Sequence, residues 1–300
     1  MPMTGYIRNT DMLLGVMGDP IAQSKSPLMH TAALKALGIP GAYVPLHIAP
    51  GQLGEAVQAI RTLGFRGVNV TIPHKIAVMD YLDKLDASAV AGGAVNTIVN
   101  DNGVLTGYNT DGIGYVRSLK AEAVPDLSGA HILVLGAGGA ARGIISALLQ
   151  ENPASVVIAN RTADKAQELA ASWQAAGIVT GAAMENIAGM IPDADIVINT
   201  TSVGMFPYPN DTPVASGLFR KGQVVSDLIY NPLRTRLLEE GLQAGCTIHG
   251  GLGMFIYQGA YALEYWTGEA APVDIMRQTL LEAFGVSEPD MKMLKQGNNI

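Results

Sequence analysis

A lysine that follows a strand-like run is a candidate for acid–base catalysis in this chain. In NVTIPHK, residues 69–75, apolar side chains alternate with polar ones up to Ile72, which is typical of a half-buried strand, and Pro73 ends the pattern. A lysine there is most often an ordinary surface residue. At the mouth of a cleft, however, its ammonium group can donate a proton and stabilise a developing oxyanion. Lys75 is therefore a candidate acid–base residue.

Two hydroxyl groups flank the start of a predicted helix in SKSP, residues 24–27. Ser26 suits the N-cap position and Pro27 the first helical position, so a helix start alone accounts for both. It does not account for Ser24. Two hydroxyls beside a helix N-terminus can hold a carboxylate without a buried cation, so this segment is a candidate anion site.

A glycine-rich turn joins a short apolar strand to an amphipathic helix in HILVLGAGGAARGIISALL, residues 131–149. Gly136, Gly138 and Gly139 follow the pattern G-x-G-G-x-A, with Ala141 in place of the last glycine. Glycine there lets a pyrophosphate approach the amides at the helix N-terminus. A lone glycine turn is a weak signal, but here the strand before it, the helix after it and a second strand all agree. The segment predicts a dinucleotide site.

The end of the second strand indicates which dinucleotide is bound. NAD sites usually place Asp or Glu about 20 residues beyond the glycine turn, where it accepts a hydrogen bond from the ribose. Here Asn160, Arg161 and Thr162 begin 24 residues after Gly136, and none carries a carboxylate. Arginine suits a 2′-phosphate and a flat adenine face. The alternative without a binding role is that Arg161 is an ordinary solvated arginine and Thr162 caps the next helix. Such a cap is also compatible with cofactor binding. We predict NADP rather than NAD.

The elements that must position these residues alternate between apolar runs and longer amphipathic stretches. This is the pattern of an α/β protein with a largely parallel sheet. In the first part of the chain, strands are expected at 13–18, 43–48 and 67–72, and helices at about 26–38 and 51–63. A hairpin is expected next, with its turn at Asp101-Asn102-Gly103.

A second series of strands follows Pro125 and indicates a separate nucleotide domain. Its expected strands are 131–136, 155–160, 195–200 and 223–228, with helices between them. The tail from Gly250 to Gly285 is mainly helical and is expected to return to the first domain. We predict an α/β fold with two domains: an α/β substrate domain of residues 1–112 plus 250–300, and a Rossmann-type NADP domain of residues 113–249.

The composition fits a compact protein with more than one core. The 300 residues are 48% hydrophobic and 15% charged, and the net charge of −7 gives no reason to expect nucleic acid or an anionic membrane as a partner. No apolar run reaches the ~18 residues of a membrane helix, and the start of the chain does not form a secretory signal. The single cysteine, Cys246, suits a reducing cytoplasm and a small buried role. The five histidines are scattered without ligand spacing, so no metal is expected.

Nine short strings, in order along the chain, resemble the shikimate dehydrogenase family: SKSP, NVTIPHK, GGAVNT, GYNTDG, GAGGAAR, NRT, NTTSVGM, DLIYNP and GGLGMFIYQ. The likeness runs from about Met12 to about Gly285. It implies a reversible, NADPH-dependent reduction of 3-dehydroshikimate to shikimate, on the route to chorismate and the aromatic amino acids. It also implies a cleft between the substrate domain and the Rossmann domain.

The resemblance assigns roles to individual residues of this sequence. Lys75 would be the catalytic lysine, paired with Asp111. The substrate would be bound by Ser24 and Ser26 at its carboxylate, by Thr71, Asn96 and Asp111 at its hydroxyls, and also by Tyr230 and Gln258. The cofactor would be bound by Gly136, Ala137, Gly138, Gly139, Ala140, Asn160, Arg161, Thr162, Thr200, Ile229, Gly251 and Met254. His74 stands where many members have phenylalanine, and we interpret it as a neutral packing substitute.

Three other functions stay open on the sequence alone. The first is a relative that also oxidises quinate, although relatives that use quinate and NAD tend to carry an acidic residue where Arg161 stands. The second is a non-catalytic NADP-binding sensor, which would be expected to have lost Lys75 or Asp111. The third is another two-domain Rossmann oxidoreductase, such as a methylene-tetrahydrofolate dehydrogenase, against which SKSP and NTDG together argue. The partner is expected to be a small-molecule substrate, and a homodimer stays open.

Overall fold

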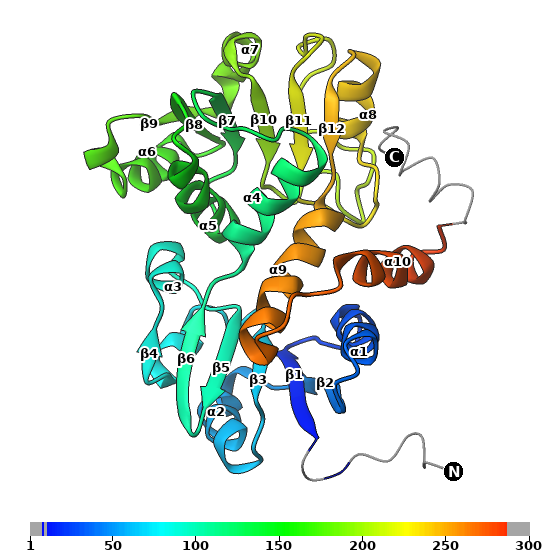
Figure 1. Cartoon of the computed structure of the whole chain (residues 1–300). Helices are drawn as coiled ribbons and strands as arrows, with labels where there is room; N and C mark the ends of the chain where they lie inside the picture. Colours follow the sequence, from blue (N-terminus) through cyan, green and yellow to red (C-terminus); the bar gives the residue numbers. More distant parts are fainter. Residues whose placement is uncertain (1–7, 9–10, 287–300) are drawn as a thin grey trace. The chain divides into compact units, whose positions relative to one another are not determined.

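The computed structural model describes residue 8 and residues 11–286, and the chain is arranged as two compact units (Figure 1). The first unit contains the described residues up to Thr110 and those from Gln258 on, and the second unit is Asp111–Tyr257. Both divisions fall at helices, because α4 begins at Asp111 and α9, Gly251–Thr267, continues through the second division. The bounds expected from the sequence lie a few residues from these points. The assignment of substrate to one unit and cofactor to the other remains a prediction.

A six-stranded sheet in the order β2-β1-β3-β5-β6-β4 forms the centre of the first unit. β1 pairs in parallel with β2 and β3, whereas β5 runs antiparallel to both β3 and β6. The carboxyl ends of β1 and β3 therefore lie at the same sheet edge as the start of β5 and the end of β6. The strands are β1 Met12–Gly18, β2 Gly41–His47, β3 Gly67–Val70, β4 Lys84–Leu85, β5 Thr97–Asp101 and β6 Val104–Tyr108.

The central strand β3 differs from the expectation. A half-buried strand over 67–72 is wrong, because β3 ends at Val70 and all four of its residues are buried. Both faces of the sheet are covered here, so the strand has no solvent-facing side. Ile72, beyond the strand, is 66% exposed. Alternation in this segment therefore reflects a buried polar residue, Asn69, rather than exposure to water.

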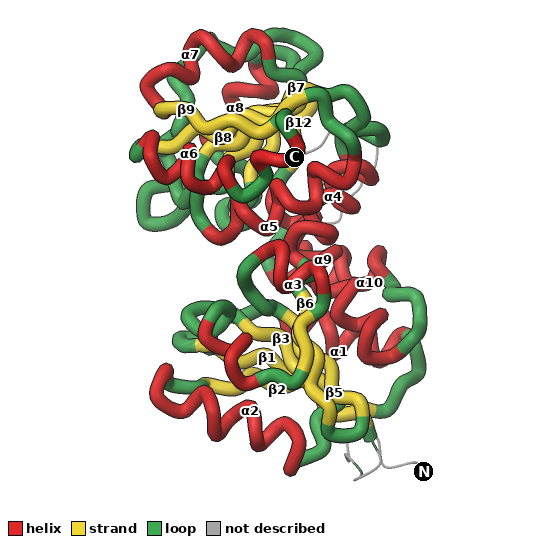
Figure 2. The backbone as a smooth tube through the Cα atoms, turned by 90° about the vertical axis from the view of Figure 1, so that its left-hand side faces the viewer, coloured by secondary structure: helices red, strands yellow, loops and turns green. Residues whose placement is uncertain are grey.

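Helices cover this sheet on both sides, with α2 on one side and α1 and α10 on the other (Figure 2). The α2 side holds a core that joins Val57 and Ile60 of that helix to Val68 and Ile98 of the sheet. On the other side, α1 packs against α10. The bounds are α1 Ser26–Ala36, α2 Leu53–Thr62, α3 Ala87–Gly92 and α10 Val273–Ala283, with the short 3-10 turns η1 Pro50–Gln52 and η2 Ala77–Tyr81.

The helical tail completes the first unit. Arg66 Nε donates to the carbonyl oxygen of Trp266 at 2.8 Å, and Trp266 Nε1 donates to the carbonyl oxygen of Ile98 at 3.0 Å. Any side chain at Gly67 would overlap the Trp266 indole, so glycine is required for this close approach. The prediction of a mainly helical tail is confirmed by α9 and α10.

The predicted hairpin is also confirmed. β5 and β6 pair antiparallel around Asn102, with φ of +53°, and Gly103, with φ of +91°. Positive φ at both central residues is the two-residue turn that asparagine and glycine favour. Because the hairpin reverses the chain, residues 109–110 return to the sheet edge at which β5 begins.

A second six-stranded sheet, in the order β12-β11-β10-β7-β8-β9, forms the centre of the second unit, and all its pairs are parallel (Figure 1). Counted along the chain from β7, this order is 3-2-1-4-5-6, the order of dinucleotide-binding folds. The predicted α/β class with a Rossmann-type unit is confirmed. β9 and β12 were not predicted, because one is rich in small residues and the other has only three. The strands are β7 His131–Leu135, β8 Ser155–Asn160, β9 Val179–Ala183, β10 Ile196–Asn199, β11 Val224–Asp227 and β12 Thr247–His249.

Two apolar cores cover the two faces of this sheet. Ile132 and Val134 of β7 face one core, whereas Leu133 and Leu135 of the same strand face the other. A strand buried on both faces needs a continuous apolar run, which explains the string HILVL. The helices of this unit are α4 Asp111–Glu122, α5 Gly139–Leu148, α6 Ala163–Ala171, α7 Ile187–Met190 and α8 Arg236–Gln243, with 3-10 turns η3 Leu149–Glu151, η4 Gln174–Ala176, η5 Met184–Asn186 and η6 Ile191–Asp193.

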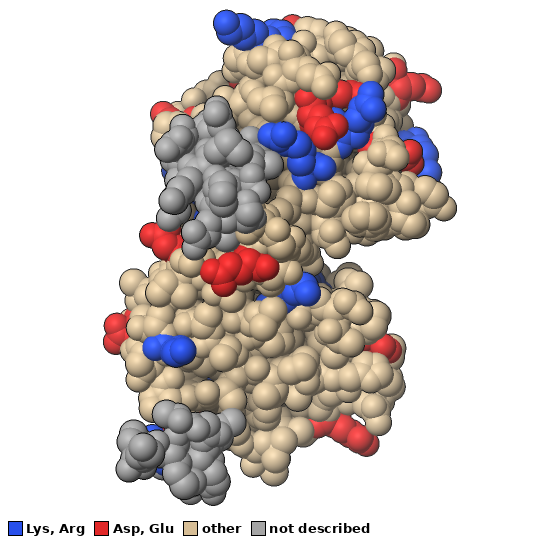
Figure 3. All heavy atoms as spheres, turned by 90° about the vertical axis from the view of Figure 1, so that its right-hand side faces the viewer, with Lys and Arg blue, Asp and Glu red and all other residues tan. Residues whose placement is uncertain are grey.

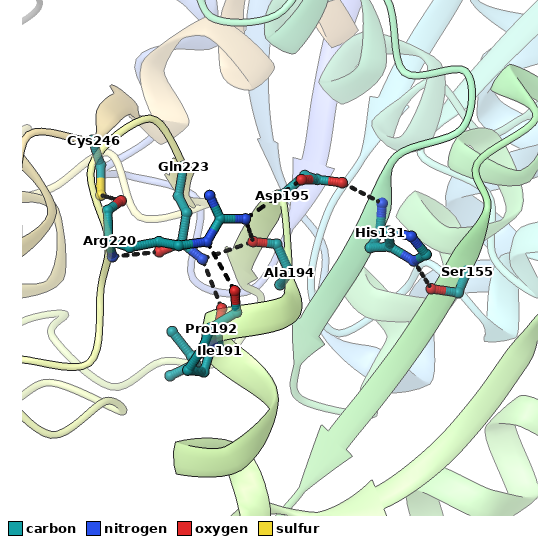
Figure 4. Close-up of polar contacts among 9 residues, drawn as sticks. All are labelled: His131, Ser155, Ile191, Pro192, Ala194, Asp195, Arg220, Gln223 and Cys246. Atoms are coloured by element: carbon teal, nitrogen blue, oxygen red, sulfur yellow. Dashed lines mark hydrogen bonds and ion pairs between the residues drawn. The ribbon is translucent and has the colours of Figure 1, made fainter.

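Polar contacts tie the amino ends of these strands together (Figure 4). Gln223 Nε2 donates to the carbonyl oxygens of Ile191 at 2.6 Å and Ala194 at 2.7 Å. Cys246 Sγ lies 3.3 Å from the carbonyl oxygen of Arg220, and burial raises the pKa of its thiol. The prediction of a small buried role for Cys246 is confirmed. These contacts lie at the strand edge opposite the glycine turn, so they serve the scaffold.

Acidic and basic side chains are scattered over the molecular face in Figure 3, without a large patch of either sign. Within residue 8 and residues 11–286, no helix combines the length and apolar character that a membrane span needs. The same part of the chain contains no group of three or more His, Cys, Asp or Glu side chains that could hold a metal ion.

Candidate active site

Four of the predicted substrate residues lie at one edge of the first unit's sheet. Ser24 and Ser26 follow β1, Thr71 directly follows β3, and Asn96 directly precedes β5. The strand directions bring these chain positions to the same edge. The edge is the carboxyl end of the parallel strands, where ligands bind in open α/β sheets.

Lys75 lies in a turn beyond β3 and is partly buried. Its carbonyl oxygen accepts a hydrogen bond from Val95 N at 2.8 Å, which fixes the turn beside the start of β5. The preceding residue, His74, is 1% exposed, and its Nε2 donates to the carbonyl oxygen of Ile48 at 2.6 Å. His74 is thus buried, as a packing substitute requires. It also adds a hydrogen bond that phenylalanine could not make, and this bond anchors the turn that carries Lys75.

The start of α1 differs by one residue from the expectation. Ser26 as the N-cap is wrong, because Lys25 adopts helical φ and ψ and α1 begins at Ser26. Ser24 Oγ instead accepts a hydrogen bond from Ser26 N at 3.3 Å. Ser26 is 7% exposed, and its hydroxyl donates to the Tyr43 hydroxyl. Both serines therefore have oxygens at this helix start, as the sequence predicts for an anion site.

A buried chain of hydrogen bonds runs from Tyr43 across the sheet. Asn69 Nδ2 donates to Thr97 Oγ1 at 3.0 Å and to the carbonyl oxygen of Asn96 at 3.1 Å. Because both amide hydrogens are used, Asn69 Oδ1 accepts from the Tyr43 hydroxyl at 2.7 Å. Burial raises the pKa of Tyr43 well above its ordinary value, so this hydroxyl keeps its proton. The chain fixes the polar groups beneath the predicted substrate residues.

Asn96 forms the end of this chain and has a defined orientation. Its Oδ1 accepts from Thr110 N at 2.8 Å, and a backbone N–H can only donate. Its Nδ2 therefore faces Thr110 Oγ1 at 2.9 Å and Gln258 Oε1 at 3.5 Å. The structure thus brings Asn96 and Gln258 together across 162 residues of sequence. Asp111 directly follows Thr110 and begins α4, but its pairing with Lys75 remains a prediction.

The glycine turn of the second unit has the shape that a dinucleotide needs. Gly136 has φ of +109°, and a Cβ there would lie 2.6 Å from Thr200 Oγ1. Thr200 Oγ1 donates to the carbonyl oxygen of Leu135 at 2.7 Å. Gly138 and Gly139 are exposed, and a Cβ on either would meet no atom within 4 Å. The open space lies at the start of α5, beside Ala137 and Ala140, and it fits a pyrophosphate.

The NRT segment ends β8 next to this turn. Asn160 Nδ2 donates to the carbonyl oxygen of Thr162 at 2.9 Å, which curls the segment. Thr162 occupies the N-cap position of α6, but its side chain makes no capping hydrogen bond. Arg161 is exposed and makes no hydrogen bond or ion pair with another of the described residues. A guanidinium group in this condition can bind a phosphate.

The remaining predicted residues follow β11 and begin α9. Gly251 N donates to the carbonyl oxygen of Ile229 at 3.2 Å, and a side chain at Gly251 would overlap the Leu228 carbonyl. Tyr230 stacks on Phe255 with ring centroids 4.9 Å apart, and burial raises its pKa. Met254 packs against the core of the second unit. Its role at the cofactor remains a prediction.

Sequence reasoning missed several polar residues that support these positions. Tyr43, Thr97 and Thr110 belong to this set. Thr97 adjoins Asn96 in the chain, but its bond to Asn69 spans 28 residues, the Thr110–Asn96 bond spans 14 and the Tyr43–Asn69 bond spans 26. Asn199 and Asp227 are buried at the ends of β10 and β11 and bond to each other at 3.1 Å. In the sequence, Asn199 and Asp227 are recognisable only as polar residues at the end of an apolar strand. That pattern does not distinguish a buried polar residue from an exposed turn residue.

Three sequence models of known families match the chain in order. They are described as shikimate dehydrogenase substrate binding domain (residues 16–98), shikimate / quinate 5-dehydrogenase (residues 118–207) and shikimate 5'-dehydrogenase C-terminal domain (residues 251–281). A curated relative, the shikimate dehydrogenase (NADP(+)) of Moorella thermoacetica, is 47% identical over 279 residues, which cover 92% of this chain and 94% of the relative. This chain belongs to the shikimate dehydrogenase family. The family predicted from the nine strings is confirmed.

Solved structures of similar proteins share the whole fold. Shikimate 5-dehydrogenase from Listeria monocytogenes, solved with shikimate and NAD, is 36% identical with a TM-score of 0.86, covering 93% of this chain and 99% of that one. Quinate dehydrogenase from Corynebacterium glutamicum, solved with NAD, is 32% identical with a TM-score of 0.85, covering 91% and 99%. Both of these structures hold NAD, whereas the Moorella relative is named for NADP(+), and the two solved enzymes are named for different substrates. One fold therefore accompanies different substrates and cofactors, and the choice between them depends on side chains.

Proposed function

We propose that this shikimate dehydrogenase family member catalyses the reversible, NADPH-dependent reduction of 3-dehydroshikimate to shikimate. It is an oxidoreductase that acts on a CH–OH group in the route to chorismate and the aromatic amino acids. The observation that carries this proposal is the gathering of Ser24, Ser26, Thr71 and Asn96 at one sheet edge, with Lys75 in the turn beside them. Those groups suit a small hydroxylated carboxylic acid.

The serine pair is proposed to bind the substrate carboxylate. Ser24 and Ser26 offer hydroxyls at the start of α1, where the helix dipole also favours negative charge. Asn96 Nδ2, directed toward Thr110 and Gln258, is proposed to donate to a ring hydroxyl. Thr71, Tyr230 and Gln258 complete the proposed substrate contacts.

Lys75 is proposed to be the proton donor. NADPH, when bound, supplies the hydride. The carbonyl oxygen of the substrate then carries negative charge, which a lysine ammonium group can stabilise and protonate. Asp111, at the first turn of α4, is proposed to orient Lys75 and to accept from a substrate hydroxyl. Both residues being present also weighs against a non-catalytic sensor.

NADP is the proposed cofactor. The open turn at Gly136–Ala140 has room for the pyrophosphate, and the exposed Arg161 provides a cation for the 2′-phosphate. Thr200, Ile229, Gly251 and Met254 are proposed to line the path toward the nicotinamide. The absence of an acidic residue among Asn160, Arg161 and Thr162 favours NADP over the NAD of the quinate-using relatives.

The proposal extends to cellular setting and assembly. We expect the enzyme to act in the cytoplasm on a small-molecule substrate, without nucleic acid as a partner. A homodimer is the oligomer to test first, and light scattering during size-exclusion chromatography measures it directly.

Initial rates in four mixtures test the function. Shikimate and quinate are each oxidised with NADP and with NAD, and the reduced cofactor is followed by absorbance. Activity restricted to shikimate with NADP is the expected result. Comparable rates with quinate would assign the protein to the broader relatives. Binding of NADP without turnover in any mixture would leave the sensor function instead.

A further inference from the structure

A buried carboxylate lies beneath the cofactor side of the second unit. Asp227, the last residue of β11, is 0% exposed. Its Oδ1 accepts from Asn199 Nδ2 at 3.1 Å and from Ile229 N at 3.1 Å, and its Oδ2 accepts from Thr235 Oγ1 at 2.7 Å. Burial raises the pKa of Asp227 to about 6 although all three donors act to lower it.

The carboxylate holds one loop through Asn199. Asn199 Oδ1 accepts from Thr201 N at 3.0 Å and from Thr201 Oγ1 at 2.7 Å, and its Nδ2 donates to the carbonyl oxygen of Val203 at 3.3 Å as well as to Asp227. This loop begins with Thr200, whose hydroxyl is bonded to Leu135 beside the glycine turn. The Asn199–Asp227 contact therefore fixes the segment after β10.

The carboxylate also holds the segment after β11. Its bond to Ile229 N sets the chain direction just before Tyr230, and its bond to Thr235 ties the start of α8 to the same point. The two segments pack together, because a Cβ at Gly204 would lie 3.7 Å from both Ile229 Cδ1 and Thr235 Cβ. One side chain thus anchors both loops that carry predicted cofactor residues.

We propose that Asp227 is a positioning residue for the nicotinamide end of the cofactor site, acting through Ile229 and the Thr200 loop. This inference rests on the proposed function. Asp227 need not touch cofactor or substrate, because it acts on the backbone that does. An asparagine at this position would have the same shape, but it would present NH₂ to the Thr235 hydroxyl. Thr235 Oγ1, which already accepts from Leu238 N, would then have to accept a second hydrogen bond instead of donating one, and the shared anchor of the two segments would be weakened.

A purely structural role would not favour this residue. An ionised carboxylate in a buried place reduces stability unless its partners compensate for the lost hydration. The raised pKa of Asp227 indicates that three donors compensate only in part. A charge kept at a cost to stability is expected where function needs a rigid arrangement.

Asp227→Asn tests the proposal in the full-length enzyme. We expect kcat for shikimate oxidation with NADP to fall about 10- to 100-fold, as for a misplacement of reacting groups by about 1 Å. KM for shikimate should change less than about threefold, since Tyr230 is the one proposed substrate residue that adjoins a segment held by Asp227. Thermal unfolding of the variant at pH 8, followed by calorimetry, should have a midpoint temperature no lower than in the wild type. A kcat within threefold of the wild type, or a loss of stability large enough to explain the lost activity, would overturn the proposal.

Thr235 supplies a milder pair of variants. Thr235→Val removes the donor to Asp227 and is expected to lower kcat about 3- to 10-fold, the effect of one hydrogen bond, whereas Thr235→Ser keeps the hydroxyl and should restore it. Equal kcat in the two variants would also overturn the proposal.

The fluorescence of bound NADPH reports the surroundings of the nicotinamide without turnover. Its emission should differ between the wild type and Asp227→Asn, and identical emission would count against the inference. An inactive wild type would instead count against the proposed function, and this readout would still decide the role of Asp227.

Discussion

The buried histidine of the first unit should make this unit sensitive to acid. His30 is 0% exposed, stacks on Tyr43 with ring centroids 4.4 Å apart, and lies 5.5 Å from the Trp266 ring. Neither ring nitrogen has a hydrogen-bond partner among the described residues. Burial lowers the pKa of His30 from 6.5 to about 3, so the folded protein holds the imidazole neutral.

The sign and size of the effect follow from this shift. The unfolded chain binds the proton first as the pH falls, so the stability is complete above about pH 6.5 and is lost progressively toward pH 3. At about 1.4 kcal/mol per pH unit, the loss between pH 8 and pH 5 is about 2 kcal/mol. His30→Phe keeps a ring against Tyr43 but cannot titrate. Between pH 8 and pH 5, the unfolding free energy of His30→Phe should therefore fall by about 2 kcal/mol less than that of the parent protein, whatever the absolute stability of the variant.

Fluorescence can isolate the first unit. The chain has two tryptophans, and Trp173→Phe leaves only Trp266, which contacts His30. In the Trp173→Phe protein, urea unfolding at pH 8 and pH 5 gives the loss of unfolding free energy between the two pH values, with His30 present and with His30→Phe added. His131→Gln, which removes an exposed histidine of the second unit, is the matched control and should keep the full loss. The reasoning would be refuted if His30→Phe lost as much stability as the parent between the two pH values.

Three further predictions concern activity and packing. Lys75→Ala should lower kcat about 10²- to 10⁴-fold with a smaller change in shikimate binding. Lys84→Ala, at the exposed strand β4, is the control and should leave kcat unchanged. A Lys75→Ala variant with near-normal turnover would contradict the assignment of Lys75 as the proton donor. Arg161→Ala should lower the preference for NADP over NAD about 10- to 100-fold, measured as the ratio of the two kcat/KM values. This is the contribution expected of charge-assisted hydrogen bonds to a phosphate. An unchanged ratio would contradict the role of Arg161. Gly251→Ala should lower the unfolding free energy of the second unit by about 1–3 kcal/mol through backbone overlap. Gly250→Ala, whose Cβ would lie 3.5 Å from its nearest neighbour, is its control, and equal effects would show that overlap is not the cause.

Local patterns were enough for the parts of the fold that local chemistry decides. The Asn102-Gly103 turn needs positive φ at both residues, and few other residue pairs supply it. The apolar run of β7, followed by a glycine turn and a helix, indicated a Rossmann-type unit because each step has a distinct composition. The short edge strand β12 and the small-residue strand β9 carry no such pattern, so they were missed.

The candidate site was predictable where a family motif gave its residues and not where distant residues support them. Asn96 and Gln258 belong to recognised strings, but their contact depends on how the tail returns to the sheet. The error at Ser26 has a local cause, because either Lys25 or Ser26 could have been the residue before the first helical turn. Asp227 lay inside the string DLIYNP, yet its burial and three donors depend on β10, β11 and α8 together.

The tail that completes the first unit imposes an order on the synthesis of this protein. Among the described residues, the second unit is one uninterrupted stretch, Asp111–Tyr257, whereas the first unit needs residues from both sides of it. Domains fold largely as units while the chain emerges from the ribosome. The second unit can therefore fold before Trp266 has been made, but the sheet of the first unit must wait for it, since Arg66 and Trp266 bond across 200 residues. A chain arrested before Trp266 would carry a finished nucleotide fold and an unfinished sheet with its apolar side exposed, which is the form that chaperones and proteases would meet.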